Sequence, residues 1–157
     1  MITLVDITTD NLHQFQSDIL EIENFSFPSP WSPKAFLEEM GRTCSYLWAL
    51  ITDQGVAGYI CFWMLTGKIH LLNIAVHPEK RGAGLGRYLL NRMIEKGRSN
   101  GIETAWLEVR PSNKRAIVFY KRAGFRETGR RPLYYNDTNE DAIVMALTVS
   151  SRVERAA

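Results

Sequence analysis

The sequence predicts an α/β protein built around one mixed β-sheet. Segments rich in β-branched and aromatic residues alternate along the chain with segments whose apolar residues recur at helical spacing. A glycine-rich turn in the middle of the chain joins a strand-like run directly to an amphipathic helix. The 157 residues, 45% of them hydrophobic and 23% charged, are enough for one domain with its own core.

The first half of the chain predicts one strand, two helices and a pair of strands. The alternation in ITLVDIT favours a strand at residues 2–8, and the apolar residues of 10–23 follow a helical period. Ser32 and Pro33 are typical of the N-cap and first residue of a short helix. SYLWALIT and VAGYICFWML flank a turn that ends at Gly55, which indicates a strand–turn–strand unit.

The second half continues with a strand, a helix and a further strand. IHLLNIAV predicts a strand at residues 69–76, and ETAWLEVR predicts another at 103–110. The helix between them begins inside the glycine-rich loop. Its apolar positions share one face, and they are Leu85, Tyr88, Leu89 and Met93.

A last helix and two strands complete the predicted fold. Ser112 is expected to cap a helix over 113–123, and Gly124 is expected to end it. FRETGRRPLYY and DAIVMALTV predict two closing strands. The order is therefore β-α-α-β-β-β-α-β-α-β-β, with a parallel, right-handed central strand–helix–strand unit and mostly antiparallel pairing elsewhere. We expect one domain over residues 1–149 and a frayed tail over 150–157.

Charge and hydropathy argue against several partners. A net charge of +2 gives no reason to expect nucleic acid or an anionic membrane as a direct partner. The opening MITLVDITTD lacks the apolar stretch of a signal peptide, and the apolar run YICFWML is too short to span a bilayer. We therefore expect a cytoplasmic protein. The sequence leaves its oligomeric state open.

Neither the cysteines nor the histidines have the spacing of a metal site. Cys44 and Cys61 lie in strand-like segments and are interpreted as buried free thiols in a reducing compartment. His13, His70 and His77 are scattered along the chain, so we expect surface or packing roles for them and no bound metal.

The glycine-rich loop has the properties of an anion site. Consecutive backbone N–H groups at the start of a helix bind phosphates, and glycines let a ligand approach closely. The loop does not contain G-x-x-x-x-G-K-[ST]. It does not fit G-x-G-x-x-G either, because Arg87 or Leu89 stands where the third glycine would be needed. It fits R-x-x-G-x-G instead, through Arg81, Gly82, Ala83, Gly84, Leu85 and Gly86. A plain strand-to-helix turn is the alternative.

The chain resembles the GNAT acetyltransferase superfamily, whose R-x-x-G-x-G loop holds the pyrophosphate of acyl-CoA. Within it the chain is most similar to the RimI type, through NIAV, RGAGLGR, WLEVRPSN, AIVFYKRAGF, RRPLYY, EDAIVMAL and the upstream PWS. The resemblance implies a GNAT fold with acetyl-CoA as co-substrate. It also implies acetyl transfer to the N-terminal alanine of ribosomal protein eighteen of the small subunit, by direct attack in a ternary complex.

Glu108 is the candidate base. The strand period places Trp106 and Glu108 on one face, near the carboxyl end of the strand, where ligands bind in such sheets. We expect its apolar strand to raise the pKa of this carboxyl, which suits proton acceptance directly or through water. The resemblance places the base at this position. A solvent-exposed or salt-bridged glutamate is the alternative.

Tyr120 is the candidate acid, and Asn113 shares its helix face. A phenol can protonate a departing thiolate or donate a hydrogen bond to it. The resemblance assigns the acid role to Tyr120 and a cofactor contact to Asn113. A tyrosine packed in the core, with its hydroxyl satisfied there, is the alternative.

The remaining site residues rest on the resemblance. NIAV, and with it Ile74, Ala75 and Val76, is expected to pair with the pantetheine arm and to contain a bulge. The resemblance implies that an N–H group freed there, such as that of Val76, polarises the thioester. Arg87 follows the loop and is grouped with the cofactor residues. The peptide entrance is expected to contain Trp31, Tyr134 and Tyr135. Two alternatives remain, namely a GNAT enzyme that acts on small amines or lysine side chains and a non-catalytic acyl-CoA-binding module.

Overall fold

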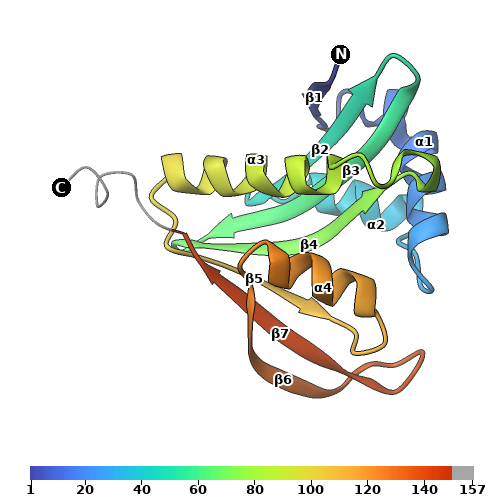
Figure 1. The fold of residues 1–157 in the computed structure, drawn as a ribbon. Helices are drawn as coiled ribbons and strands as arrows, with labels where there is room; N and C mark the ends of the chain where they lie inside the picture. The colour runs from blue at the N-terminus through green and yellow to red at the C-terminus, as the bar shows by residue number, and fades with distance from the viewer. Residues whose placement is uncertain (150–157) are drawn as a thin grey trace.

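Seven strands form one continuous sheet in the order β1-β2-β3-β4-β5-β7-β6 (Figure 1). The structure is a computed structural model that describes residues 1–149. The strands are β1 (Thr3–Asp6), β2 (Ser45–Thr52), β3 (Gly55–Leu65), β4 (Lys68–Val76), β5 (Thr104–Val109), β6 (Arg126–Tyr135) and β7 (Glu140–Thr148). The helices are α1 (Leu12–Ser26), α2 (Pro33–Met40), α3 (Leu85–Ser99) and α4 (Lys114–Arg122), with a 3₁₀ turn η1 (Pro78–Lys80). The predicted class and element order are confirmed.

The sheet separates at its one parallel pair among the described strands. β4 and β5 pair only from Lys68 to Leu71 on one strand and from Thr104 to Leu107 on the other. Beyond these residues the two strands diverge toward their carboxyl ends, as Figure 1 shows. A register shift against β3 leaves Leu72 as a bulge just before the divergent segment. The strands therefore open a V between the two halves of the sheet.

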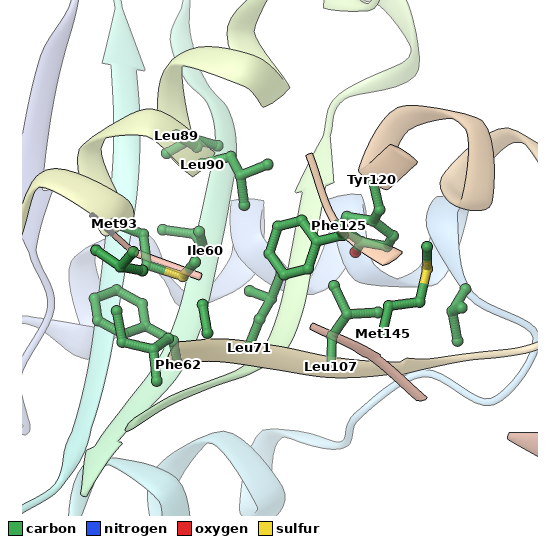
Figure 2. Close-up of a cluster of buried hydrophobic side chains, with 14 of the residues drawn as sticks. Ile60, Phe62, Leu71, Leu89, Leu90, Met93, Leu107, Tyr120, Phe125 and Met145 are labelled. Atoms are coloured by element: carbon green, nitrogen blue, oxygen red, sulfur yellow. The ribbon is translucent and has the colours of Figure 1, made fainter. Parts of the chain in front are cut away.

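Apolar layers cover both faces of the sheet. On one face Leu89, Leu90 and Met93 of α3 pack on strand residues that include Ile60 and Phe62 (Figure 2). On the other face a second cluster forms around α1 and α2. The predicted helix face needs one correction. Tyr88 is 37% exposed, whereas Leu90, which was not predicted, is buried. The face of α3 that contacts β3 and β4 therefore includes Leu90 and leaves out Tyr88.

The helix boundaries test the predicted caps. Ser32 is confirmed as an N-cap, because its Oγ accepts from the Ala35 N–H at 3.1 Å. The predicted Ser112 cap is wrong. Asn113 caps α4, accepting from the Ala116 N–H at 3.2 Å, whereas the N–H and hydroxyl of Ser112 both bind Glu140. Helix α1 also runs three residues further than residue 23, to Ser26.

Three other expectations concern membrane-spanning helices, the two cysteines and the C-terminal tail. Within residues 1–149 no helix combines the length and apolar content needed to cross a bilayer. Cys44 and Cys61 are free thiols, and Cys61 is fully buried while Cys44 is half-buried. The expected tail at 150–157 lies outside the described residues.

Candidate active site

A cleft of about 230 Å³ lies where β4 and β5 separate. Its walls come from both strands, from α4, from the segment between α1 and α2, and from the end of β6. Six residues expected at the site from the sequence line it together, and they are Trp31, Ile74, Glu108, Asn113, Tyr120 and Tyr135. The split sheet therefore brings residues from five separate segments to one concave place, which is where ligands bind in sheets of this kind.

Glu108 is buried at the floor of this cleft. Its side chain is 8% exposed, and its Oε1 lies 3.0 Å from His70 Nε2. Its Oε2 is shielded from solvent and lies 3.3 Å from an Arg131 nitrogen, and the Tyr134 phenol approaches the same carboxylate. The expected raised pKa is wrong. Burial raises the pKa of Glu108, but the His70 hydrogen bond and the Arg131 charge outweigh it, so the net shift is downward.

Tyr120 closes the α4 side of the cleft. The residue is only 9% exposed, and its ring contacts that of Phe119 at a centroid distance of 5.4 Å. It also contacts the ring of Phe125 at 5.7 Å (Figure 2). Burial raises the pKa of its phenol well above the usual value, and the nearby Tyr135 adds to this effect. The hydroxyl is therefore protonated throughout the physiological pH range and can act as a donor.

The glycine-rich loop forms the start of α3. Gly82 and Gly84 have φ angles of +87° and +81°, in the left-handed region that glycine tolerates. Gly84 is the N-cap and offers no side-chain acceptor to the first N–H groups of α3. A Cβ on Gly86 would lie 3.4 Å from the Phe119 ring, so α3 and α4 approach closely there. These features suit an anion at the helix N-terminus.

The two arginines of this loop have their own contacts. Arg81 Nε donates to the Val76 carbonyl at 3.0 Å, and a second nitrogen of Arg81 donates to Ser26 Oγ at 3.2 Å. Arg87 donates to the Arg122 carbonyl at 3.2 Å, near the end of α4. Both side chains are exposed, so they fasten the loop to neighbouring elements and leave its backbone N–H groups as the anion donors.

Within residues 1–149, the divergent part of β4 has one edge that pairs with no other strand. Ile74, Ala75 and Val76 pair with β3 on one side, whereas pairing with β5 has already ended at Leu71. The bulge predicted from the resemblance is present, and it lies at Leu72, one residue before NIAV. A strand edge with free backbone groups can pair with an extended ligand that carries amides.

A hydrogen-bonded cluster of Ser29, Arg110 and Asp137, here called the clasp, lies beside the cleft. Ser29 Oγ donates to Asp137 Oδ2 at 2.6 Å, and Arg110 holds both oxygens of Asp137 at 2.7 and 2.9 Å. Hydrogen bonds from Arg110 and Ser29 lower the pKa of Asp137 to about 2. The Arg110 guanidinium also lies 4.0 Å from the ring centroid of Tyr135. The clasp joins the α1–α2 segment to the β6–β7 turn.

The structure separates the two adjacent tyrosines, which the sequence could not. Tyr135 lines the cleft, and burial, followed by the charge of Glu108, raises the pKa of its phenol to about 12. Tyr134 is 44% exposed and lies beside Glu108 and Arg131. The first is part of the cleft wall and the second is near its outer edge.

Glu23 is a cleft residue that the sequence analysis missed. It is 1% exposed, and its Oε2 accepts from the Trp31 N–H at 2.8 Å. Its Oε1 accepts from Asn73 Nδ2 at 3.0 Å and from the Tyr59 hydroxyl. Burial raises its pKa, although these hydrogen bonds offset part of the effect. An acidic residue four positions after the buried Ile19 was the available signal.

His70 was assigned a surface or packing role, and the structure places it against Glu108 instead. Its ring also stacks on Trp106, with a centroid distance of 3.7 Å. The four tryptophans, Trp31, Trp48, Trp63 and Trp106, are all half-buried. Among residues 1–149 no cluster of His, Cys, Asp and Glu has the arrangement of a metal site. The cleft thus brings a carboxylate and a phenol next to the strand edge of β4 that β5 leaves unpaired, and the glycine-rich start of α3 follows β4 along the chain.

Comparisons with known proteins agree with this geometry. The acetyltransferase (GNAT) family model matches residues 16–125. The [ribosomal protein bS18]-alanine N-acetyltransferase of Escherichia coli K12 is 40% identical over 132 residues, which is 82% of this chain and 88% of that protein. The corresponding enzyme of Haemophilus influenzae is 34% identical over 131 residues, again with 82% and 88% covered.

Solved structures give the same picture. The crystal structure of the ribosomal-protein-S18-alanine N-acetyltransferase from Escherichia coli aligns with a TM-score of 0.83 and 35% identity, covering 96% of this chain and 95% of that one. Arabidopsis thaliana NAA60 in complex with acetyl-CoA aligns with a TM-score of 0.80 at 17% identity, covering 95% and 99%. The latter similarity concerns the fold alone.

Proposed function

This chain belongs to the GNAT acetyltransferase family and is an acetyl-CoA-dependent N-acetyltransferase, and on that premise we propose that it acetylates the N-terminal alanine of ribosomal protein bS18. The relatives that share 34–40% of its sequence carry this activity in their names. Ribosomal proteins are made in the cytoplasm, so the proposed substrate places the enzyme there. Its protein partner is the N-terminus of a ribosomal or similar protein.

One observation carries the proposal. A buried carboxylate and a buried phenol line the same cleft, Glu108 from β5 and Tyr120 from α4, at the point where the sheet splits. Acetyl transfer to an amine requires one group that accepts the amine proton and another that donates to the departing thiolate. The two side chains supply both functions from opposite walls.

The lowered pKa of Glu108 favours an α-amine as the acceptor. An α-amine has a pKa of about 8, so making it neutral at pH 7 costs about 1 kcal/mol. A lysine amine costs about 4.6 kcal/mol under the same conditions. A carboxylate held in its charged form by His70 and Arg131 is a modest base, and it is better matched to the smaller of these costs.

The fit of acetyl-CoA rests on two backbone features. The uncapped start of α3 at Gly84 presents N–H groups to a diphosphate, and the free edge of β4 over residues 73–76 presents groups to the pantetheine amides. Asn113 uses its Oδ1 to cap α4, so its Nδ2 is the atom left for the ligand. Acetyl-CoA supplies an acetyl group activated as a thioester.

Each step of the reaction is assigned to a particular residue of the chain. Glu108 accepts the amine proton, directly or through one water, while the nitrogen lone pair forms the C–N bond to the thioester carbonyl carbon, and the electrons of the broken N–H bond stay on nitrogen. The C–S bond then breaks and its electron pair leaves on the sulfur. Tyr120 donates a proton or a hydrogen bond to the sulfur. Because the pKa of its phenol is raised, the hydroxyl keeps its proton until this step. Trp31, Tyr134 and Tyr135 border the entrance and hold the first residues of the peptide.

A peptide with two competing amines tests the proposal. The peptide begins Ala-Arg, has a free α-amine and contains one internal lysine. After incubation with enzyme and acetyl-CoA, tandem mass spectrometry is expected to find one acetyl group, on the N-terminal residue. The same peptide with a blocked N-terminus is the control and should remain unmodified.

Two other results would contradict the proposal. Acetylation of the lysine would identify a side-chain or small-amine acetyltransferase. Absence of any acetylated product, together with measurable acetyl-CoA binding, would identify a non-catalytic acyl-CoA-binding module.

Gly84→Ala tests the role of the loop. The left-handed φ of +81° is unfavourable for alanine by about 1–2 kcal/mol, and the loop can relieve this strain only by moving its N–H groups. A Cβ at Gly84 would meet no atom of the described residues within 4 Å, so backbone strain and not a clash is the effect of this substitution. We expect the dissociation constant of acetyl-CoA to rise about 5- to 30-fold in isothermal titration calorimetry.

Gly101→Ala is the matched control. Gly101 has φ +73° and equally open surroundings, but it follows the opposite end of α3. Its variant should lose comparable stability and keep the wild-type affinity for acetyl-CoA. Equal affinities in the two variants would remove the loop from the cofactor site.

A further inference from the structure

His70 lies in β4 beside the carboxylate of Glu108. Its Nε2 is 3.0 Å from Glu108 Oε1, and the two side chains are 18% and 8% exposed. In the parallel register His70 is opposite Trp106, two residues before Glu108 on the same face of β5. The contact therefore follows from strand register, because His70 lies in the paired part of β4 and β5 and Glu108 comes one residue after it.

Two aromatic rings hold the imidazole of His70 in place. Trp106 stacks against it with a centroid distance of 3.7 Å and an interplanar angle of 7°. Trp63, its partner in β3, meets it edge-on at 5.6 Å and 85°. Because one ring covers its face and another its edge, the imidazole has little freedom to rotate away from Glu108.

The two oxygens of Glu108 have different surroundings. Oε1 is engaged by His70 of β4, whereas Oε2 is shielded from solvent with the Arg131 guanidinium 3.3 Å away, and the Tyr134 phenol approaches the same carboxylate. A carboxylate that accepts a proton needs a lone pair aimed at the donor. The direction of the lone pairs of Glu108 therefore depends on His70 on one side and on the two β6 residues on the other.

We propose that His70 is a positioning residue for the catalytic carboxylate: its Nε2–H donates to Oε1 and thereby holds the carboxylate of Glu108 in the orientation in which it accepts the amine proton. This inference rests on the proposed function, in which Glu108 is the base. It assigns His70 no contact with substrate and no proton of its own to transfer.

The charged groups around His70 determine the pH consequence. Glu108 faces it from β5, and Arg131 and Tyr134 of β6 approach the same carboxylate. On the β3 side Trp63 donates to Glu39 and lies under Arg42 of the α2 end. A hydrogen bond to the charged carboxylate lowers its pKa. Loss of His70 therefore raises the pKa of Glu108 and moves the acid limb of kcat/KM to higher pH.

Three substitutions at His70 test this role. The amide nitrogen of His70→Gln can reach Oε1 much as Nε2 does, the shorter amide of His70→Asn cannot, and His70→Leu removes the donor altogether. We expect Leu and Asn to lower kcat about tenfold and to move the acid limb upward. We expect Gln to keep kcat within about threefold of wild type, with the acid limb unchanged.

The controls separate positioning from folding and from cofactor binding. His13→Leu removes an exposed imidazole on α1 and should leave kcat unchanged. Calorimetry should give the wild-type acetyl-CoA affinity for every His70 variant, because no residue of the glycine-rich loop is among those that line the cleft around Glu108. If His70→Leu does not fold, the comparison of Gln with Asn carries the test.

Different results would overturn the role of His70 and the role of Glu108. Wild-type kcat and pH profile in His70→Asn or His70→Leu would overturn the inference while leaving Glu108 as the base. A His70→Gln variant as impaired as His70→Leu would also overturn it, since a positioned donor would then be insufficient. Full activity in Glu108→Gln would instead overturn the base assignment of the proposed function.

Discussion

Glu108→Gln is expected to lower the turnover number about 10²- to 10⁴-fold and to leave acetyl-CoA binding intact. The amide has nearly the shape of the carboxylate, and its oxygen can still accept from His70, whose Nε2 lies 3.0 Å from Oε1. It cannot accept a proton from the amine. Steady-state kinetics with the Ala-Arg peptide give the turnover number, and calorimetry gives the acetyl-CoA affinity.

The pH profile provides a second check on the same residue. The pKa of Glu108 is lowered, so the carboxylate is charged above the usual glutamate pKa of about 4.3 and loses its function only as the pH falls through the lower folded value. We expect the wild-type acid limb of Glu108 below that usual pKa. The rise toward pH 8 then reports the amine of the peptide.

A control variant distinguishes this loss from a general effect of removing charge. Glu95→Gln changes a half-exposed glutamate of α3 that pairs with Arg92 at 2.9 Å, and it should retain wild-type turnover. Full activity in Glu108→Gln would show that another group, or water alone, accepts the amine proton.

Tyr120→Phe is expected to lower the turnover number by a similar factor, about 10²- to 10⁴-fold. The phenol is buried and its pKa is raised by that burial, so it is a donor at every pH of interest. Phenylalanine keeps the ring contacts with Phe119 and with Phe125 (Figure 2) and removes only the hydroxyl. We therefore expect the thermal unfolding midpoint to change little while kcat falls.

Tyr88→Phe is the matched control. Tyr88 lies on the exposed side of α3, 37% accessible, and loss of its hydroxyl should change neither kcat nor the unfolding midpoint. If Tyr120→Phe keeps the wild-type kcat, the departing thiolate receives its proton from elsewhere, and Tyr120 is a core residue of α4. The peptide KM helps to separate these cases, because a donor to the leaving group should affect kcat more than KM.

Local sequence determined most of the fold. Alternation in SYLWALIT and in ETAWLEVR gave strands that end within one residue of the observed β2 and β5, because side-chain period is a property of the strand itself. The Ser32–Pro33 helix start and the glycine-rich helix start are equally local, since each depends on backbone geometry over a few residues. The parallel central unit followed from the handedness of such connections.

The local sequence did not predict the N-cap of α4 correctly, because two neighbouring residues can both cap a helix. Ser112 and Asn113 are both good N-cap residues, and the choice between them depends on Glu140, which lies 28 positions away and binds the N–H and hydroxyl of Ser112. With Ser112 engaged by β7, Asn113 caps α4. A partner so distant in sequence leaves no mark on the local pattern.

The chemistry of the site was decided by tertiary structure. The sequence identified Glu108 and Tyr120 as candidates by their faces and by resemblance, and the structure places both at one cleft. It could not give the pKa direction of Glu108, because His70 is 38 positions away and Arg131 approaches from β6. Periodicity tells which face a side chain takes, whereas strand register and the approach of separate elements decide which charges meet there.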